Sequence, residues 1–159
     1  MTRLDILPPE PERWPRTMGI VLFGVLAGMA CLRYLALGTL VHDLGLTVRD
    51  LTAMNSEGQW WRAMNGHIQP VLWLFAWLMR PLPEWLAPLG LMVAQTFALA
   101  LPLPALARRY GPFPALAYFA FFAVWYNGVL DFHTDHLAVP LTFWFFFAAQ
   151  DGKPWRAAF

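Results

Sequence analysis

Long apolar runs separated by short polar segments dominate the pattern along the chain. The runs cover residues 17–40, 84–106, 112–130 and 136–149. A helix rises about 1.5 Å per residue, so the first run would extend about 36 Å, which exceeds a hydrocarbon core of about 30 Å. The pattern predicts an all-α, polytopic integral membrane protein with about four transmembrane helices at these positions.

Two weaker helical signals lie between the first two runs. Apolar residues recur at helical spacing within a polar segment, which predicts an amphipathic helix on the membrane surface; they are Leu44, Val48, Leu51 and Met54. Residues 67–80 are apolar, but as a helix they would extend only about 21 Å. We therefore expect interfacial or re-entrant helices within 43–80, in the first extracytoplasmic loop.

The basic residues favour one orientation of the chain. Most of them lie before the first run, at the turn that follows residue 106, or beyond residue 149, namely Arg3, Arg13, Arg16, Arg108, Arg109, Lys153 and Arg156. If 67–80 does not cross the membrane, all of these lie on one side, which the positive-inside rule makes the cytoplasm. The predicted domains are a cytoplasmic tail (1–16), a transmembrane domain (17–149) and a second cytoplasmic tail (150–159). The acidic, proline-rich start argues against a cleaved signal peptide.

Composition agrees with lipid as the solvent. Hydrophobic residues make up 58% of the chain and charged residues 13%, against about 25% charged residues in soluble domains. The net charge is only +1, and no basic patch alternates with aromatic residues, so nucleic acid is not an expected partner. The expected partner is the lipid bilayer. Cys31 is the single cysteine, which excludes an internal disulfide.

The candidate chemistry is concentrated just before the last apolar run. Asp131 and Asp135 are four residues apart, and His133 and His136 three apart, so each pair would share one face of a helix. Asp131, His133 and Asp135 are candidate ligands for a divalent metal, because carboxylate and imidazole suit such ions. Alternatively an Asp orients a His that acts as a general base. The simplest alternative is a solvated loop in which Asp135 caps the helix that begins near Leu137.

Other residues of the spans and loops carry weaker signals. Arg33 lies about two-thirds of the way along the first run, where it either snorkels to the outer interface or pairs with Asp131 or Asp135. The small residues of Gly24-xxx-Gly28 offer a face for close helix packing. Apart from Arg33, the runs hold no deeply placed charge, which disfavours a transporter or channel.

The predicted orientation brings several polar residues to one extracytoplasmic face. They are His42, Asp43, His67 and the cluster at 131–136. Histidines near lipid also ligate haem or pigment molecules, so a bound pigment or lipid at His42 or His67 is a further alternative.

Several motifs resemble one known family. They are Tyr34 followed by His42-Asp43-Leu44-Gly45, then Gly66-His67-Ile68-Gln69-Pro70, then Ala107-Arg108-Arg109, then Leu130-Asp131-Phe132-His133 with Leu137-Ala138-Val139-Pro140-Leu141. In this order they resemble the N-terminal part of a family of bacterial polytopic membrane proteins of unassigned function. That family is similar to GT-C glycosyltransferases, which transfer sugars from polyprenyl-phosphate carriers to acceptors outside the cytoplasm. The resemblance implies a bacterial inner membrane, either cytoplasmic or intracytoplasmic.

The resemblance also implies roles for individual residues. Asp43 would correspond to the acidic residue that acts as a base or orients the acceptor. Asp131 and Asp135 would correspond to a second acidic site near the carrier phosphate or its metal. Together these three are the candidate catalytic residues, and the expected substrate-binding residues are His67, His133, His136 and Arg33.

Two departures from the family change the functional prediction. Where its members continue the first motif with a second Asp and a Gln, this chain has Val48 and Arg49. Such enzymes also use many more helices than about four. The sequence therefore favours a membrane-embedded structural or accessory subunit of a larger complex, derived from a shortened GT-C-like fold. The alternative is an N-terminal fragment of a lipid-linked-sugar-dependent glycosyltransferase.

Overall fold

The described part of the chain is mainly helical. The structure is a computed structural model that describes residues 13–37, 42–64 and 69–152, and it contains no β-strand within these ranges. In chain order the elements are α1 (Trp14–Leu37), α2 (His42–Ser56), the 3-10 helix η1 (Trp60–Met64), α3 (Val71–Met79), α4 (Leu86–Ala100), α5 (Leu103–Tyr110), α6 (Pro112–Ala120), α7 (Phe122–Val129), the 3-10 helix η2 (Thr134–Ala138) and α8 (Val139–Gln150). The predicted all-α class is confirmed.

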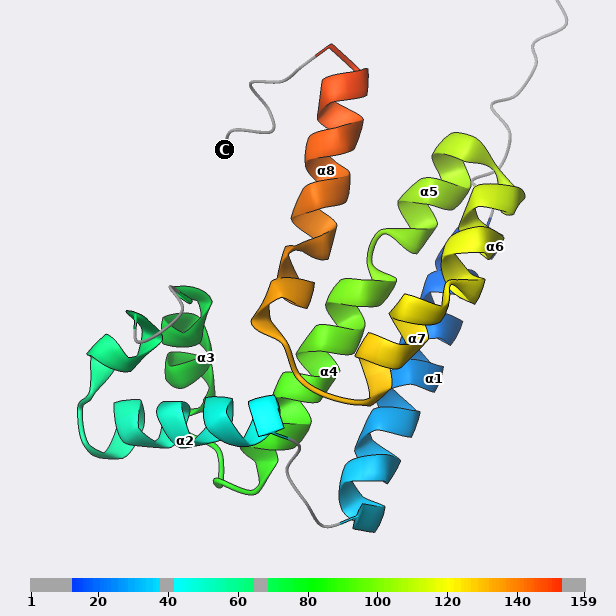
Figure 1. Cartoon of the computed structure of the whole chain (residues 1–159). Helices are drawn as coiled ribbons and strands as arrows, with labels where there is room; N and C mark the ends of the chain where they lie inside the picture. The colour runs from blue at the N-terminus through cyan, green and yellow to red at the C-terminus, as the bar shows by residue number, and fades with distance from the viewer. Residues whose placement is uncertain (1–12, 38–41, 65–68, 153–159) are drawn as a thin grey trace, which may run out of the picture.

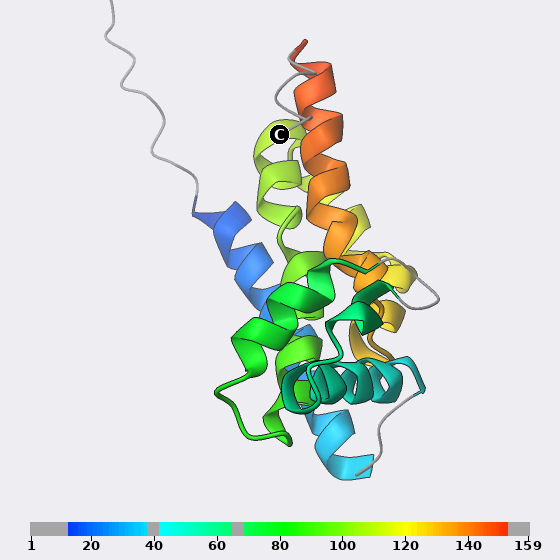
Figure 2. The same cartoon turned by 90° about the vertical axis from the view of Figure 1, so that its left-hand side faces the viewer.

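Two helices are long and apolar enough to cross a membrane. The first is α1, with 24 residues, and the second is the nearly continuous α4–α5 stretch from Leu86 to Tyr110, with 25 residues. They run antiparallel, side by side (Figures 1 and 2). Between them Leu22, Leu26 and Ala30 of α1 are fully buried, at the four-residue spacing of one helix face. Large apolar side chains elsewhere on α1 are exposed, as expected for a helix that contacts lipid.

The other two predicted spans are not single long helices. The run 112–130 is divided at Phe121, whose backbone is extended (φ −66°, ψ 117°). The break frees the carbonyl of Phe119, which accepts a 2.5 Å hydrogen bond from the indole of Trp125. The run 136–149 begins inside η2, and the α-helix that follows, α8, has only 12 residues and rises about 18 Å. Pro140 suits the start of α8, because that position needs no backbone donor.

The segment between the two long helices folds against the protein. Figure 1 shows α2 lying crosswise to α1 and α4, with α3 beside it. Leu44 and Met54 of α2 are fully buried, in one cluster with Phe75 of α3 and Leu91 of α4. The apolar stripe predicted to face a membrane surface therefore packs on protein. Residues 67–80 were expected to be too short to cross a membrane, and α3 has nine residues.

The small residues that permit close packing are not those of the Gly24-xxx-Gly28 motif. A Cβ atom added at Gly24 or Gly28 would meet nothing within 4 Å, whereas one at Gly19 would lie 2.6 Å from Cγ of Pro104 on α5. The same atom at Gly128 would lie 3.1 Å from Leu26. The contact between α1 and α5 therefore depends on Gly19, and the prediction for Gly24 and Gly28 is wrong for packing within the described chain.

This contact can be tested with matched glycine substitutions. Gly19→Ala should lower the thermal stability of the detergent-solubilised protein by about 1–3 kcal/mol, because the added methyl overlaps the Pro104 ring. Gly24→Ala adds the same methyl to open space on the same helix and should be neutral or stabilising, by up to about 1 kcal/mol. Equal effects in thermal unfolding would contradict the packing described here.

Candidate functional site

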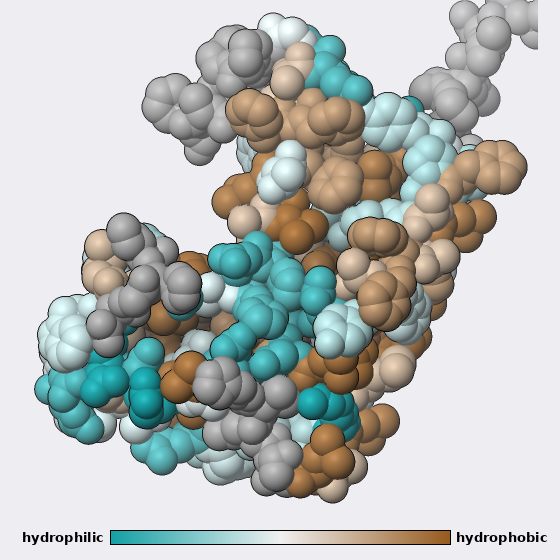
Figure 3. Space-filling view, in the orientation of Figure 1, coloured by the Kyte–Doolittle hydropathy of each residue, from teal (hydrophilic) through white to brown (hydrophobic). Residues whose placement is uncertain are grey.

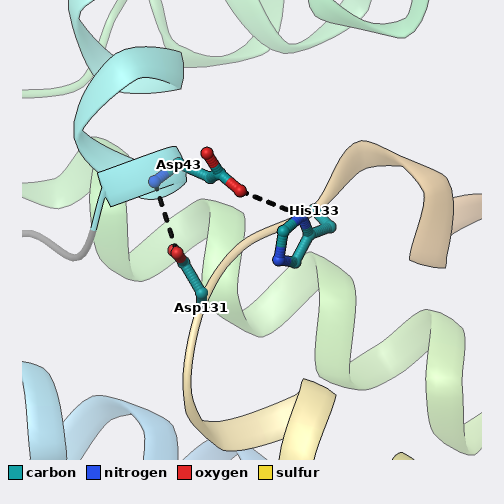
Figure 4. A group of neighbouring side chains, drawn as sticks. All are labelled: Asp43, Asp131 and His133. Carbon is teal, nitrogen blue, oxygen red and sulfur yellow. Dashed lines mark hydrogen bonds and ion pairs between the residues drawn. The ribbon is translucent and has the colours of Figure 1, made fainter.

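Asp43 and His133 meet where α2 begins. Asp43 lies in the first turn of α2, and His133 lies in the loop between α7 and η2. The two side chains are 39% and 45% exposed, and Oδ2 of Asp43 is 3.1 Å from Nδ1 of His133 (Figure 4). This is an ion-pair contact, which carries full charge on both partners only when the imidazole is protonated. A carboxylate beside an imidazole is the arrangement in which an Asp orients a His that acts as a base.

The Asp131 carboxylate caps the start of α2, although the two segments are far apart in the sequence. Its Oδ1 accepts hydrogen bonds from the backbone N–H of Leu44 (3.1 Å) and of Phe132 (2.7 Å), and its Oδ2 accepts one from the N–H of Asp43 (3.3 Å). The first amides of a helix lack internal partners, and they favour an anion. These bonds use three of the roughly four acceptor positions of a carboxylate. Asp131 therefore acts mainly as a cap that joins segments 88 residues apart.

Arg33 caps the C-terminus of α7. Its Nη1 donates to the carbonyl of Val129 (3.2 Å) and to that of Leu130, at the C-terminus of α7. Carbonyls at a helix C-terminus lack internal donors and attract a cation. Within the described residues Arg33 forms no ion pair with Asp131 or Asp135, so the alternative in which it pairs with one of these carboxylates is not found. Arg33 instead binds the carbonyls immediately before Asp131, because these need a donor.

Gln95 is a site residue that the sequence interpretation missed. Gln95 lies within α4 and is only 1% exposed. Its Nε2 donates hydrogen bonds to the carbonyls of Asn127 (2.6 Å) and Asp131 (2.7 Å). Its Oε1 accepts from the backbone N–H of His133 (2.7 Å) and lies 3.1 Å from Nδ1 of His136. One buried amide thus holds the 127–136 segment against α4. The signal was available: Gln95 is a strongly polar residue in an otherwise apolar run.

His136 is the second imidazole of the site. Its ring centroid lies 5.3 Å from that of His133, in an edge-to-face arrangement. Partial burial lowers the pKa of His136, and the nearby His133 lowers it further, while Asp135 acts in the opposite direction. His136 therefore favours its neutral form.

The remaining predicted residues contribute less in the described structure. Asp135 is exposed and makes no side-chain hydrogen bond to any described residue. It does not cap a helix, because the residues preceding η2 and α8 are His133 and Ala138, without side-chain caps. His67 and the side chain of His42 lie outside the described residues, so pigment or lipid binding there stays a prediction.

The residues that cluster as potential metal ligands differ from the predicted set. Potential ligand atoms of Asp43, Asp131 and His133 lie within 4.8 Å of one another, so Asp43 takes the place expected for Asp135. These groups fit a cation poorly in this arrangement. Three backbone amides already donate to Asp131, and the imidazole of His133 is in ion-pair contact with Asp43. The geometry suits an Asp–His proton acceptor beside a helix cap better than a metal centre.

The fold and site together define a class of protein. It is a helical protein with two membrane-length helices and an exposed Asp–His pair, assembled by a helix cap and a buried amide. No family model, curated protein or solved structure matches the chain. The resemblance to GT-C glycosyltransferases accordingly stays a prediction.

The cap predicts unequal roles for the two clustered carboxylates. Asp131→Ala should lower the stability of the solubilised protein by about 1–3 kcal/mol, because it leaves part-buried amides of α2 without an acceptor. Asp135→Ala, four residues along and exposed, should change stability by less than about 0.5 kcal/mol. Thermal unfolding of both variants measures the difference, and similar losses would contradict the cap.

The lowered pKa of His136 predicts a pH dependence of stability. The unfolded chain binds a proton at an ordinary pKa of about 6.5, above the pKa of His136 in the folded protein. The contribution to stability is therefore fully present above about pH 6.5 and is lost as the pH falls through the folded pKa. Unfolding measured from pH 8 to pH 5 should show this loss in the wild type and a smaller one in His136→Gln. Identical pH profiles would show that His136 does not titrate as described.

Proposed function

We propose that this chain is a membrane-embedded component of a GT-C-like sugar-transfer system, in which Asp43 and His133 activate the acceptor. The observation that carries the proposal is the direct contact of Asp43 with His133, since these are residues from the two motifs with the family resemblance. Both side chains are partly exposed, so a substrate can reach them.

In the proposed reaction the Asp43–His133 pair takes up the proton of the acceptor hydroxyl. An acceptor hydroxyl attacks the anomeric carbon of a sugar on a polyprenyl-phosphate carrier. The bond from the sugar to the carrier oxygen breaks, and the carrier leaves as its phosphate. The hydroxyl proton passes to Nε2 of His133, while the Asp43 carboxylate keeps the ring oriented and stabilises its charged form.

The proposed placement has four crossings: α1, α4–α5, α6–α7 and α8. The start of α1, the α5–α6 turn and the end of α8 lie at one end of the molecule (Figure 1). Arg16, Arg108 and Arg109 are at that end, which supports a cytoplasmic location for it and for both termini in a bacterial inner membrane. Hydrophilic surface gathers over α2 and the loop before α8, while hydrophobic surface covers much of α5–α8 (Figure 3). This distribution supports an extracytoplasmic site.

A structural or accessory subunit is the second candidate. The departures from the family motif favour it: Val48 packs against the core, and Arg49 has a 63% exposed side chain next to Asp50. Neither supplies the carboxylate and amide of the family motif. Phe113, Phe122 and Leu141 are largely exposed on α6, α7 and α8, a surface that either lipid or another membrane subunit can cover. This function would need the fold but not the Asp43–His133 chemistry.

Substitution of the pair distinguishes the two functions. Transfer of labelled sugar from a polyprenyl-phosphate donor is measured in membranes that contain the full-length protein. Asp43→Asn and His133→Gln should each reduce transfer about 100-fold or more, because general-base catalysis contributes about 10²–10⁴-fold. Glu57→Gln is the control: it removes an exposed carboxylate just beyond the other end of α2, and it should retain activity.

The same variants test the subunit function. Co-purification of stoichiometric membrane partners in mild detergent, unchanged by Asp43→Asn, together with no effect on sugar transfer, would establish the second candidate over the first. A wild-type protein with neither transfer activity nor partners would contradict both.

A further inference from the structure

The hydrogen bonds of Gln95 determine which way its amide faces. The Nε2 side lies 2.6 Å and 2.7 Å from two carbonyl oxygens, which only accept. The Oε1 side lies 2.7 Å from the backbone N–H of His133, which only donates. If the amide were reversed, its oxygen would face the two carbonyl oxygens and its NH₂ group would face the backbone N–H of His133. Each such buried mismatch costs about 1–3 kcal/mol.

The orientation of Gln95 in turn fixes the proton on His136. Because Oε1 accepts and lies 3.1 Å from Nδ1 of His136, that nitrogen must carry a hydrogen. In the neutral ring the lone pair is then on Nε2. The two ring nitrogens point in different directions, so Nε2 points away from the buried amide. A solvated imidazole would exchange between its two tautomers, whereas this one is held in a single form.

We propose that Gln95 is a positioning residue that holds His136 as its Nδ1–H tautomer, so that Nε2 of His136 accepts a hydrogen bond from a hydroxyl of the ligand at the Asp43–His133 pair. The ligand part rests on the proposed function, whereas the tautomer does not.

The charges around the site indicate which part of a substrate it binds. Nδ1 of His136 is committed to Gln95, and no described residue bonds its Nε2, while Nδ1 of His133 is in ion-pair contact with Asp43. The acidic groups near them are Asp43 of α2, Asp131 of the loop before η2, and Asp135 of η2. Arg33 of α1 is the nearby cation, and it is occupied by the α7 carbonyls. The described site thus presents acceptors, which favour a hydroxyl-rich sugar or polyol over a phosphate.

The tautomer is measured directly by NMR. The full-length protein, labelled with ¹³C and ¹⁵N at histidine, is studied in detergent micelles at pH 7.5, and His136 is assigned with His136→Gln. The ring ¹⁵N shifts should show Nδ1–H for wild-type His136. In Gln95→Leu, which removes the acceptor, the signal should move toward a mixture of tautomers. Nε2–H in the wild type, or no change in a folded Gln95→Leu protein, would overturn the proposal.

Two further variants separate positioning from folding. Thr96→Val changes the neighbouring buried polar residue of α4, which bonds only within its own helix, and should leave the His136 tautomer unchanged. Gln95→Glu keeps an acceptor oxygen for Nδ1 of His136, and because its second oxygen faces the carbonyls of Asn127 and Asp131 it should bind a proton there, so it should keep Nδ1–H on His136. This variant keeps the proposal testable if Gln95→Leu fails to fold, because Nε2–H in Gln95→Glu would also overturn it.

The ligand part has its own measurement in the transfer assay. His136→Phe keeps a ring but removes the acceptor, so it should raise KM for the acceptor substrate about tenfold and leave kcat within about twofold. An unchanged KM would refute the hydroxyl contact while leaving the tautomer result intact. If wild-type membranes transfer no sugar, the proposed function fails, but the NMR result still decides the role of Gln95.

Discussion

The Asp131 carboxylate and the first amides of α2 form the interaction on which the rest of the site depends. A helix N-terminus needs acceptors, and here the acceptor comes from a loop 88 residues away. Because Asp131 holds both the start of α2 and the start of the loop, Asp43 and His133 are brought within 3.1 Å of each other. The contact between the two segments is polar and directional, so it fixes their relative orientation more closely than apolar packing alone does.

Three buried or half-buried polar groups stabilise the loop from different sides. Asp131 caps α2, Arg33 caps α7, and Gln95 bonds the loop backbone from α4. Each satisfies backbone groups that would otherwise lack partners in an apolar surrounding, where such groups are costly. The acidic and histidine side chains left at or near the surface are Asp43, His133, Asp135 and partly His136. The structure therefore separates residues that build the site from residues whose side chains stay accessible, although only Phe132 lies between Asp131 and His133 in the sequence.

Part of this arrangement was predictable. Apolar run length predicts α1 and the α4–α5 stretch, and the spacing of apolar residues predicts α2. The division of α6 from α7 at Phe121 was not predictable, because no proline or glycine marks it. The role of Arg33 could not be read from the sequence either, since a carboxylate and a free helix C-terminus are both suitable partners for a guanidinium. Gln95 was identifiable as a strongly polar residue, next to Thr96, in a mainly apolar run, but its four partners were not.

The sequence by itself determined the helical class, the two membrane-length helices and the concentration of acidic and histidine residues at 131–136, because these depend on local periodicity and composition. Only the tertiary structure decided that Asp43, rather than Asp135, pairs with His133, and that Asp131 is a helix cap. Residues four apart in sequence share a face only if the segment is one regular α-helix. Here the segment is an extended loop followed by a 3-10 turn, so contacts across the fold replaced the contacts expected along the chain.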